Sequence, residues 1–289
     1  YFLNKDNFDF YKCPKCGFVF VNPQPEKEII ATELYSEKSG YQGNKKKNLA
    51  GTVPTTKQKK VLDWLTRQKR GKLLDVGCSN GEFIWLAKEA GFDVVGVELN
   101  KRTADIAKSN GLDVFFGFLE DAGFTPESFD YVYMGDVIEH TSDPITTLSL
   151  IKKILKPDGK IIIITPNLDC FWSKSTFKLY KWLNIPWSSL TPPHHLFQFS
   201  TLNLDGLMLK SGFNLISCSY THPPNLKYEL GSLHLLKEVK NKKTLSSFVF
   251  MLFSFTLYIL FYGIYVLSKP LLSKDNSLIA IYENNDDII

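Results

Sequence analysis

Acidic and small residues surround one short segment that could bind a ligand. Asp75 ends an apolar run, and the residues after it are spaced Gly77-x-Ser79-x-Gly81 before a stretch with helical periodicity. Glycines in such a loop let the backbone approach a ligand closely and adopt positive φ. A carboxylate is poorly placed beside a pyrophosphate at a helix N-terminus, but it suits a cation. S-adenosylmethionine (SAM) carries ammonium and sulfonium cations, so this loop favours SAM over NAD.

A second acid, Glu98, stands at the end of the next apolar run. A carboxylate in that place can accept hydrogen bonds from both hydroxyls of a ribose. A solvent-facing acid at a strand end is the alternative explanation for Glu98. Each feature alone is weak evidence for a cofactor site. The six features in the order strand, acid, glycine loop, helix, strand and acid are stronger evidence, and they predict a cofactor that contains a ribose.

Strands and helices alternate around these two acids. Short apolar runs predict strands at residues 72–76, 94–97, 114–116, 129–134, 160–165, 213–220 and 277–283. Helical spacing predicts helices at residues 57–70, 82–90, 101–110, 145–155 and 201–211. The run 160–165 is almost wholly β-branched, as expected for a strand buried on both faces. Strands separated by helices of this length form βαβ units, so the sequence predicts an α/β fold with a parallel sheet.

Several motifs in this region resemble those of one enzyme family. They are the loop at 75–81, the stretch from Asp136 to His140, the Leu-Lys-Pro-Asp-Gly turn at 155–159 and the segment 193–200. Residues 72–219 are similar to the class I SAM-dependent methyltransferases, especially the group with a Glu-His pair after the fourth strand. The resemblance implies a Rossmann-like sheet with helices on both faces and an antiparallel last strand. It does not specify the acceptor of the methyl group.

The resemblance also implies a set of residues that bind SAM. They are Asp75, Gly77, Cys78, Ser79, Gly81, Glu98, Leu99, Leu119, Glu120, Gly135 and Asp136. Two positions depart from the family pattern. Ser79 replaces the usual middle glycine, which is compatible with SAM because serine is small. Phe118 stands where many relatives have an acid near the adenine amino group.

Two histidines are candidates for a catalytic base. A hydroxyl acceptor must lose a proton during methyl transfer, which calls for a group that titrates near neutrality. The family pattern brings His140, and by a weaker alignment His195, towards the pocket mouth. His140 could instead cap or buttress a helix. Asp136 and Glu139 fit structural or pocket-wall roles better, and nothing in the sequence establishes the divalent metal that some related quinone methyltransferases use there.

Cys13 and Cys16 resemble one knuckle of a zinc ribbon. A structural zinc site needs four ligands, so zinc is expected only if an upstream segment supplies the others, and a metal-free turn is the alternative. Tyr35 and Tyr41 resemble an aromatic lid over SAM, although an ordinary packing role explains them equally well. The sequence has five cysteines without a disulfide-type spacing, which favours the cytoplasm.

Residues 244–268 carry no charge and are mostly apolar. A helix of this length measures about 37 Å and could cross a bilayer core of about 30 Å. A crossing would separate the predicted strand 277–283 from its partner at 213–220. We therefore expect a helix that lies on the membrane, broken at Gly263 or ended before Pro270. A weak polar stripe on one face supports this: Ser247, Ser254, Tyr258, Tyr262 and Tyr265. A buried core or dimer helix and a true span are the alternatives.

These features predict four regions: an N-terminal extension (1–45), a SAM-binding domain (46–222), a membrane-associated insertion (223–274) and a last strand with a tail (275–289).

The net charge of +4 is too small to indicate a nucleic acid partner. The insertion indicates a small-molecule or lipid-linked acceptor and a cytoplasmic enzyme held peripherally on the inner face of the membrane. O-methylation of a lipid-linked saccharide is the first hypothesis. A quinone-biosynthesis-type O-methyltransferase and a non-catalytic SAM-fold membrane scaffold are the alternatives.

Overall fold

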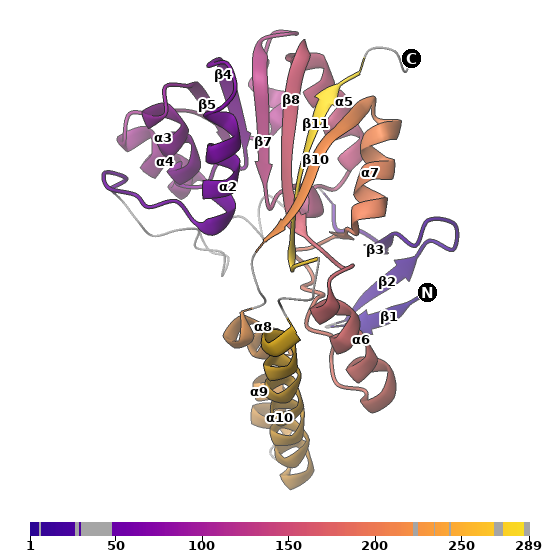
Figure 1. The fold of residues 1–289 in the computed structure, drawn as a ribbon. Coiled ribbons are helices and arrows are strands. Elements are labelled where there is room, and N and C mark those ends of the chain that lie inside the picture. Colours follow the sequence, from indigo (N-terminus) through magenta and orange to yellow (C-terminus); the bar gives the residue numbers. More distant parts are fainter. Residues whose placement is uncertain are drawn as a thin grey trace. The chain divides into compact units, whose positions relative to one another are not determined.

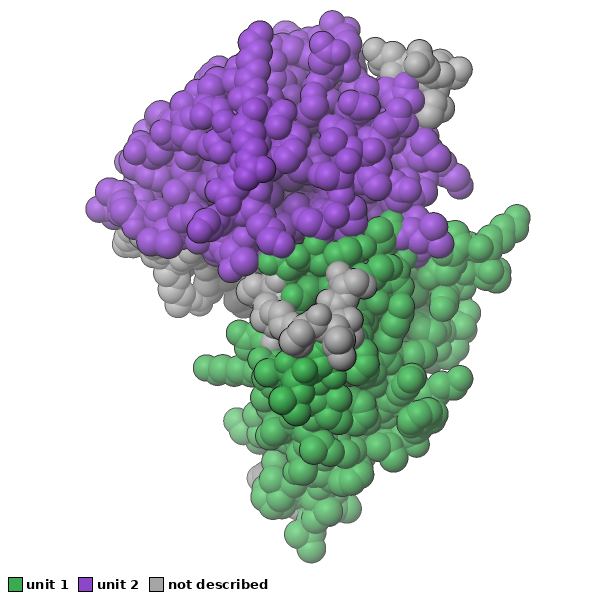
Figure 2. All heavy atoms as spheres, viewed as in Figure 1, with its two compact units in different colours: residues 1–22, 166–201, 220–277 green, residues 23–165, 202–219, 278–289 purple. Residues whose placement is uncertain are grey.

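The computed structural model describes residues 1–5, 7–26, 29, 48–221, 225–233, 235–242, 244–268 and 274–285. Tyr35, Tyr41 and Pro270 lie outside these residues. The chain divides into two compact units, which Figure 2 colours separately. Unit 1 contains residues 1–22, 166–201 and 220–277, and unit 2 contains residues 23–165, 202–219 and 278–289.

The described residues of unit 2 form a seven-stranded sheet in the order β10-β11-β8-β7-β4-β5-β6. Its strands are β4 (Lys72–Val76), β5 (Asp93–Glu98), β6 (Asp113–Phe116), β7 (Phe129–Gly135), β8 (Leu155–Pro166), β10 (Phe213–Thr221) and β11 (Ser277–Asn284). The neighbours from β8 to β6 pair in parallel. In Figure 1 the arrow of β11 runs against those of β7 and β8. The predicted α/β sheet with an antiparallel last strand is therefore confirmed.

Helices pack against this sheet: α2 (Thr56–Leu65), α3 (Glu82–Glu89), α4 (Lys101–Ser109), α5 (Pro144–Ile154) and α7 (Thr201–Lys210). Three of them begin at capping residues. Thr55 forms a capping box with Gln58 before α2, Asn100 caps α4, and Asp143 caps α5. The inward-facing side chains of α2, α3 and α4 join apolar residues of the strands in one core, which includes Leu73, Ile84, Ala104 and Ile162.

Two boundaries differ from the sequence-based expectation. Helix α2 ends at Leu65 instead of residue 70. Strand β8 begins at Leu155 instead of residue 160, and Leu155 pairs with Phe129 of β7. Pro157 explains the second difference, because proline cannot donate a helical hydrogen bond and it pushes the preceding residue away from helical geometry.

Unit 1 joins segments that are far apart in the sequence. Strands β1 (Leu3–Lys5), β2 (Phe8–Lys12), β3 (Val19–Val21) and β9 (Phe197–Gln198) form a small antiparallel sheet. Its helices are α6 (Phe171–Leu183), α8 (Leu226–Ser232), α9 (Leu235–Lys242) and α10 (Leu245–Ser268). The unit therefore cuts across the predicted regions, because 166–201 pairs with the N-terminal strands through β9 and packs on α10 through α6.

Candidate functional site

The loop between β4 and α3 has a backbone that requires glycine. Gly77 and Gly81 have φ angles of 76° and 84°, in the left-handed region. A Cβ atom on Gly77 would lie 2.6 Å from Cγ2 of Val137, and one on Gly81 would lie 2.4 Å from Cδ1 of Leu112. Ser79, at the usual middle-glycine position, also has a positive φ of 51°. The loop therefore keeps the tight path expected from its spacing, with serine tolerated at the middle position.

Two buried acids stand beside this loop. Asp75 of β4 and Glu98 of β5 are 2% and 6% exposed. Burial raises the pKa of Asp75 well above its ordinary value, and the negative charge of Glu98 raises it further. Burial also raises the pKa of Glu98, although hydrogen bonds from the Asn100 and Ser79 backbone oppose that effect. Burial and mutual repulsion disfavour the ionised form of these two carboxylates. A cation bound beside them would stabilise that form.

Glu98 also organises the loop itself. Its Oε2 accepts a hydrogen bond of 2.7 Å from the backbone N–H of Ser79, and its Oε1 accepts one of 2.7 Å from the N–H of Asn100. The sequence predicted a contact with a ribose for this residue, with a solvent-facing acid as the alternative, and did not anticipate these backbone contacts; at 6% exposure Glu98 does not face solvent. The Thr103 side chain and the Leu99 backbone also donate to this carboxylate, so Glu98 is held by several neighbours of the loop and of α4.

A cavity of about 760 Å³ opens at the carboxyl ends of the parallel strands of unit 2. This is the edge at which open α/β sheets bind ligands. Its volume lies within the range of pockets that hold small molecules and cofactors. Most of the residues predicted to bind SAM line it: Gly77, Ser79, Glu98, Leu99, Leu119, Glu120, Gly135 and Asp136. Asp75, Cys78 and Gly81 are not among its lining residues.

The cavity also has lining residues that the sequence did not single out. They are Val76, Val97, Gly117, Val137, Thr141, Ser142, Asp143, Thr146, Thr147 and Leu150. Many of these follow β7 or occupy the first turns of α5. The predicted strand 129–134 followed by a helix could have pointed to them, since residues after a parallel strand collect at the ligand-binding edge. Phe118, noted as a departure from the family pattern, lines the cavity too.

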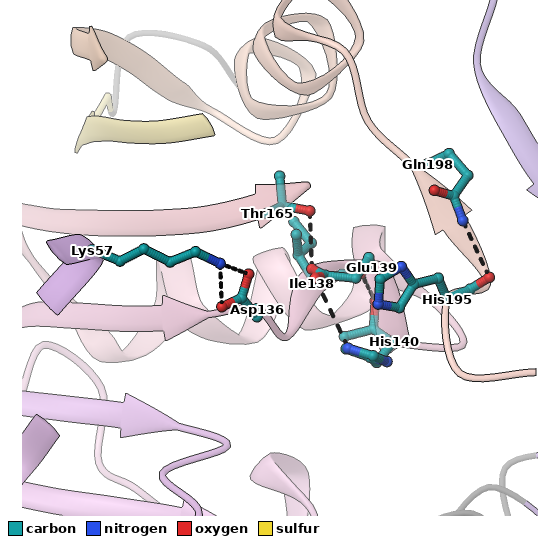
Figure 3. A network of polar contacts seen from close by, with 9 residues as sticks. Lys57, Asp136, Ile138, Glu139, His140, Thr165, His195 and Gln198 are labelled. Atoms are coloured by element: carbon teal, nitrogen blue, oxygen red, sulfur yellow. Dashed lines mark hydrogen bonds and ion pairs between the residues drawn. The ribbon is translucent and has the colours of Figure 1, made fainter. Parts of the chain in front are cut away.

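An ion pair and a buried acid follow strand β7 (Figure 3). Asp136, which has a positive φ of 56°, accepts hydrogen bonds of 2.8 Å from Nζ of Lys57 on α2. Glu139 is 1% exposed, and its Oε2 accepts a 3.0 Å hydrogen bond from Oγ1 of Thr165. Its Oε1 has no hydrogen-bond partner among the residues that the structure describes. Burial and, to a lesser degree, Asp136 raise the pKa of Glu139 to about 8, so the acid is mostly protonated at neutral pH.

The two candidate bases belong to different units. His140 ends a short 3-10 turn after β7 and lines the cavity of unit 2. Its Nε2 lies 3.9 Å from Oε1 of Glu139. His195 lies in unit 1 between α6 and β9, where its backbone carbonyl accepts a hydrogen bond from Nε2 of Gln198. The catalytic roles of both residues stay predictions.

Cys13 and Cys16 lie in the turn between β2 and β3. The backbone N–H of Gly17 donates to the carbonyl of Cys13, which closes a tight turn, and backbone groups of Cys16 and Lys15 lower the pKa of the Cys13 thiol. Within the described part of the chain, no further cysteine, histidine or acid gathers with these thiols. The two sulfurs alone do not fit a structural zinc site, which takes four ligands.

Comparisons with known proteins agree with this geometry. A family model for a methyltransferase domain matches residues 50–218. The ubiquinone biosynthesis O-methyltransferase of Aeromonas salmonicida is 28% identical over 117 residues, which cover 37% of this chain and 49% of that protein. The chain spans about half the length of the curated relatives that it matches.

Two solved structures are similar in fold. A SAM-dependent methyltransferase from Archaeoglobus fulgidus aligns with a TM-score of 0.51 at 18% identity, over 78% of this chain and 94% of that one. The [4+2]-cyclase SpnF aligns with a TM-score of 0.51 at 14% identity, over 78% of this chain and 81% of that one. The cyclase indicates that the fold alone does not define a reaction. By its sequence match and its sheet, the chain belongs to the methyltransferase-domain family, on the fold of the class I SAM-dependent methyltransferases.

Proposed function

We propose that this chain is a SAM-dependent O-methyltransferase that acts on a membrane-associated hydroxyl acceptor. One observation carries the proposal: the cavity of unit 2 adjoins a glycine loop whose two flanking acids, Asp75 and Glu98, are buried together. Such a pair is unfavourable without a positive charge nearby. A cofactor with an ammonium group and a ribose satisfies both acids, whereas the pyrophosphate of NAD would add repulsion.

The residues present fit SAM. Asp75 with the loop at Gly77 and Ser79 would hold the amino acid end, and Glu98 would hold the ribose. Residues on the facing wall of the cavity would enclose the remainder: Leu99, Leu119, Glu120, Gly135 and Asp136. When bound, SAM supplies a methyl carbon made electrophilic by its sulfonium. The protein's main task is then to orient the acceptor, because the cofactor already contains a good leaving group.

His140 is the residue that we propose as the base. It lines the cavity, and imidazole titrates in the range that proton abstraction at neutral pH requires. The imidazole takes the proton from the acceptor hydroxyl, which leaves an electron pair on the acceptor oxygen for the new bond. The neighbouring Glu139, being mostly protonated, adds little negative charge that would compete for this proton.

We consider two acceptor classes, one lipid-linked and one lipid-soluble. A saccharide on a lipid carrier is our first choice, because the knuckle-like turn at Cys13 and Cys16 resembles that of methyltransferases of surface-polysaccharide pathways. A prenylated quinone is the second, and the ubiquinone biosynthesis relatives favour it. We propose a reaction at the cytoplasmic face of the membrane. The free thiols of Cys13, Cys16, Cys78, Cys170 and Cys218 support a reducing compartment.

Calorimetric titration of the purified chain with SAM, with NAD as the comparison ligand, tests the cofactor site. We expect micromolar SAM binding, no NAD binding, and a loss of at least tenfold in SAM affinity for Asp75→Asn. Asp113→Asn, which removes an exposed acid from β6, should bind SAM like the unmodified chain. A folded sample that binds no SAM would overturn the proposed function and favour a non-catalytic scaffold. Acceptors are then sought by SAM-dependent labelling of lipid-linked saccharides and of quinone precursors.

A further inference from the structure

The long helix α10 of unit 1 presents its apolar residues to solvent. It is 24 residues long, and an 18-residue stretch of it has a mean hydropathy of 2.0 with only 22% of that stretch buried. Leu245, Leu260 and Leu267 are 79%, 58% and 83% exposed. With seven further side chains they form an apolar strip, interrupted at Thr256 and Gly263 and here termed the outer face: Phe248, Val249, Leu252, Phe253, Ile259, Ile264 and Val266. At 100° per residue, all ten positions fall on the same side of the helix.

The opposite side of α10 carries the serine and tyrosine hydroxyl groups of the predicted stripe and faces the protein, whereas Thr256 lies on the outer face, where its Oγ1 donates to the carbonyl of Leu252. Met251, Ser254, Tyr258 and Tyr265 are buried on the side that faces the protein, where the helix packs on α6, α8 and α9. The hydroxyl of Tyr258 donates to the carbonyl of Pro186 at 3.1 Å and accepts from the N–H of Ser188 at 3.3 Å. The sequence-predicted polar stripe is therefore turned inward. A helix at a water-exposed surface has the reverse arrangement, with polar groups outside.

The same packing argues against a membrane crossing. Trp172 of α6 contacts the rings of Tyr258, Tyr262 and Tyr265 edge to face, so α6 and α10 form one block. Helix α9, which also packs on α10, exposes Lys240 and Lys242 in its last turn. If α10 spanned a bilayer, α6 with its exposed Lys178 and Lys181 would have to enter the hydrocarbon with it, at a high cost for each charge. Of the two predicted interruptions, the structure shows no break at Gly263, and the helix ends at Ser268, before Pro270.

We propose that the outer face of α10 binds the surface of an anionic lipid bilayer and enters one leaflet only. The apolar strip runs the length of the helix, about 36 Å at ~1.5 Å per residue, which far exceeds the isolated apolar side chains found on ordinary surfaces. Lys240 and Lys242 adjoin its N-terminal end, where they contact anionic headgroups, an arrangement typical of interfacial helices. This inference goes beyond the proposed function and does not depend on it.

The experiment is flotation of the full chain with vesicles of phosphatidylcholine, with and without phosphatidylserine. We expect binding to both, and tighter binding with phosphatidylserine. The double variant Leu252→Glu/Leu260→Glu should lose at least tenfold in vesicle binding, because two charges enter the outer face. Leu202→Glu is the matched control: it changes a leucine that is 75% exposed on α7 and should leave binding unchanged. The double variant Lys240→Gln/Lys242→Gln should bind vesicles with phosphatidylserine at least tenfold more weakly, at about fivefold for each lysine. Its binding to vesicles of phosphatidylcholine only should not change.

Three results would overturn the proposal. One is vesicle binding by the Leu252→Glu/Leu260→Glu variant equal to that of the unmodified chain. Another is a lipid-free dimer that this variant dissociates, without any vesicle binding, which would make the outer face an interface between two copies. The third is retention in membranes through alkaline carbonate washing, which would indicate a span. SAM titration of each variant monitors the cavity of unit 2 separately, so lipid binding without SAM binding would contradict only the proposed function.

Discussion

The backbone N–H of Ser79 donates a 2.7 Å hydrogen bond to Oε2 of Glu98, the acid at the end of the neighbouring strand β5. The other carboxylate oxygen accepts from the N–H of Asn100, the residue that caps α4. A single buried side chain thus joins the glycine loop to the start of a helix. The carboxylate of Glu98 thus holds the loop through hydrogen bonds that need no ligand. These hydrogen bonds offset the free-energy cost of burying it.

Glu98→Gln is expected to weaken SAM binding by roughly 10–100-fold. An amide accepts hydrogen bonds only at its oxygen, so one of the two backbone donors loses its acceptor at a cost of about 1–3 kcal/mol. Calorimetric titration measures the change, with circular dichroism to confirm that the variant is folded. Glu89→Gln, on an exposed position of α3, is the control and should bind normally. Equal affinities for the two variants would show that the loop does not depend on Glu98.

Glu139→Gln is expected to flatten the dependence of stability on pH. Burial raises the pKa of Glu139 from 4.5 to about 8, so the folded chain holds this proton more tightly than the unfolded chain does. The stability contribution of this group is therefore complete at acidic pH, falls as the pH rises from 4.5 to about 8, and stays lost above that. Glutamine is neutral throughout.

Melting temperatures measured across this pH window test the prediction. Glu139→Gln should lose less stability towards alkaline pH than the unmodified chain, whereas Glu89→Gln should follow the unmodified chain. Parallel curves for all three proteins would mean that Glu139 titrates in its ordinary range and that its Oε1 has a stabilising partner.

Unit 2 could be predicted well because its signals are local. The β-branched run at 160–165 and the glycines at 91 and 111 mark strand and helix ends without knowledge of the fold. The glycine loop could be recognised for the same reason. The wall formed by Thr146 and Thr147 was missed: their place after the predicted strand 129–134 suggests the ligand-binding edge, but which side chains of α5 face the cavity depends on how the helix packs.

Unit 1 was largely missed because its structure depends on distant partners. Strands β1 and β3 have three residues each and β9 has two, too few for a pattern of alternating burial. Their pairing joins residues of the N-terminus to Phe197 and Gln198. Helix α6 is amphipathic, but its buried face packs on α10, whose apolar sequence suggested an independent segment. The inward orientation of the tyrosine stripe likewise follows only from this packing.

Tyr258→Phe is expected to destabilise unit 1 by about 1–3 kcal/mol, because the buried N–H of Ser188 and the partly buried carbonyl of Pro186 lose the hydroxyl that they bond. SAM affinity should not change, since the lining residues of the cavity belong to unit 2. Chemical denaturation monitored by tryptophan fluorescence measures the loss. Tyr228→Phe, at a tyrosine that is 58% exposed on α8, should have little effect. If Tyr258→Phe proved as stable as Tyr228→Phe, the hydroxyl would not anchor α10.

His140→Ala is expected to lower kcat by 10²–10⁴-fold, the usual contribution of a general base, while SAM affinity stays unchanged. His140 lines the cavity without being one of the loop residues, so its loss should affect the reaction more than cofactor binding. The measurement is methyl transfer to a lipid-linked acceptor as a function of pH. The unmodified enzyme should gain rate as the imidazole deprotonates, and the variant should lose that inflection. Added imidazole should restore part of its rate, which a purely structural role would not allow. An unchanged pH profile in the variant would assign His140 to the pocket wall and direct the search for a base to His195.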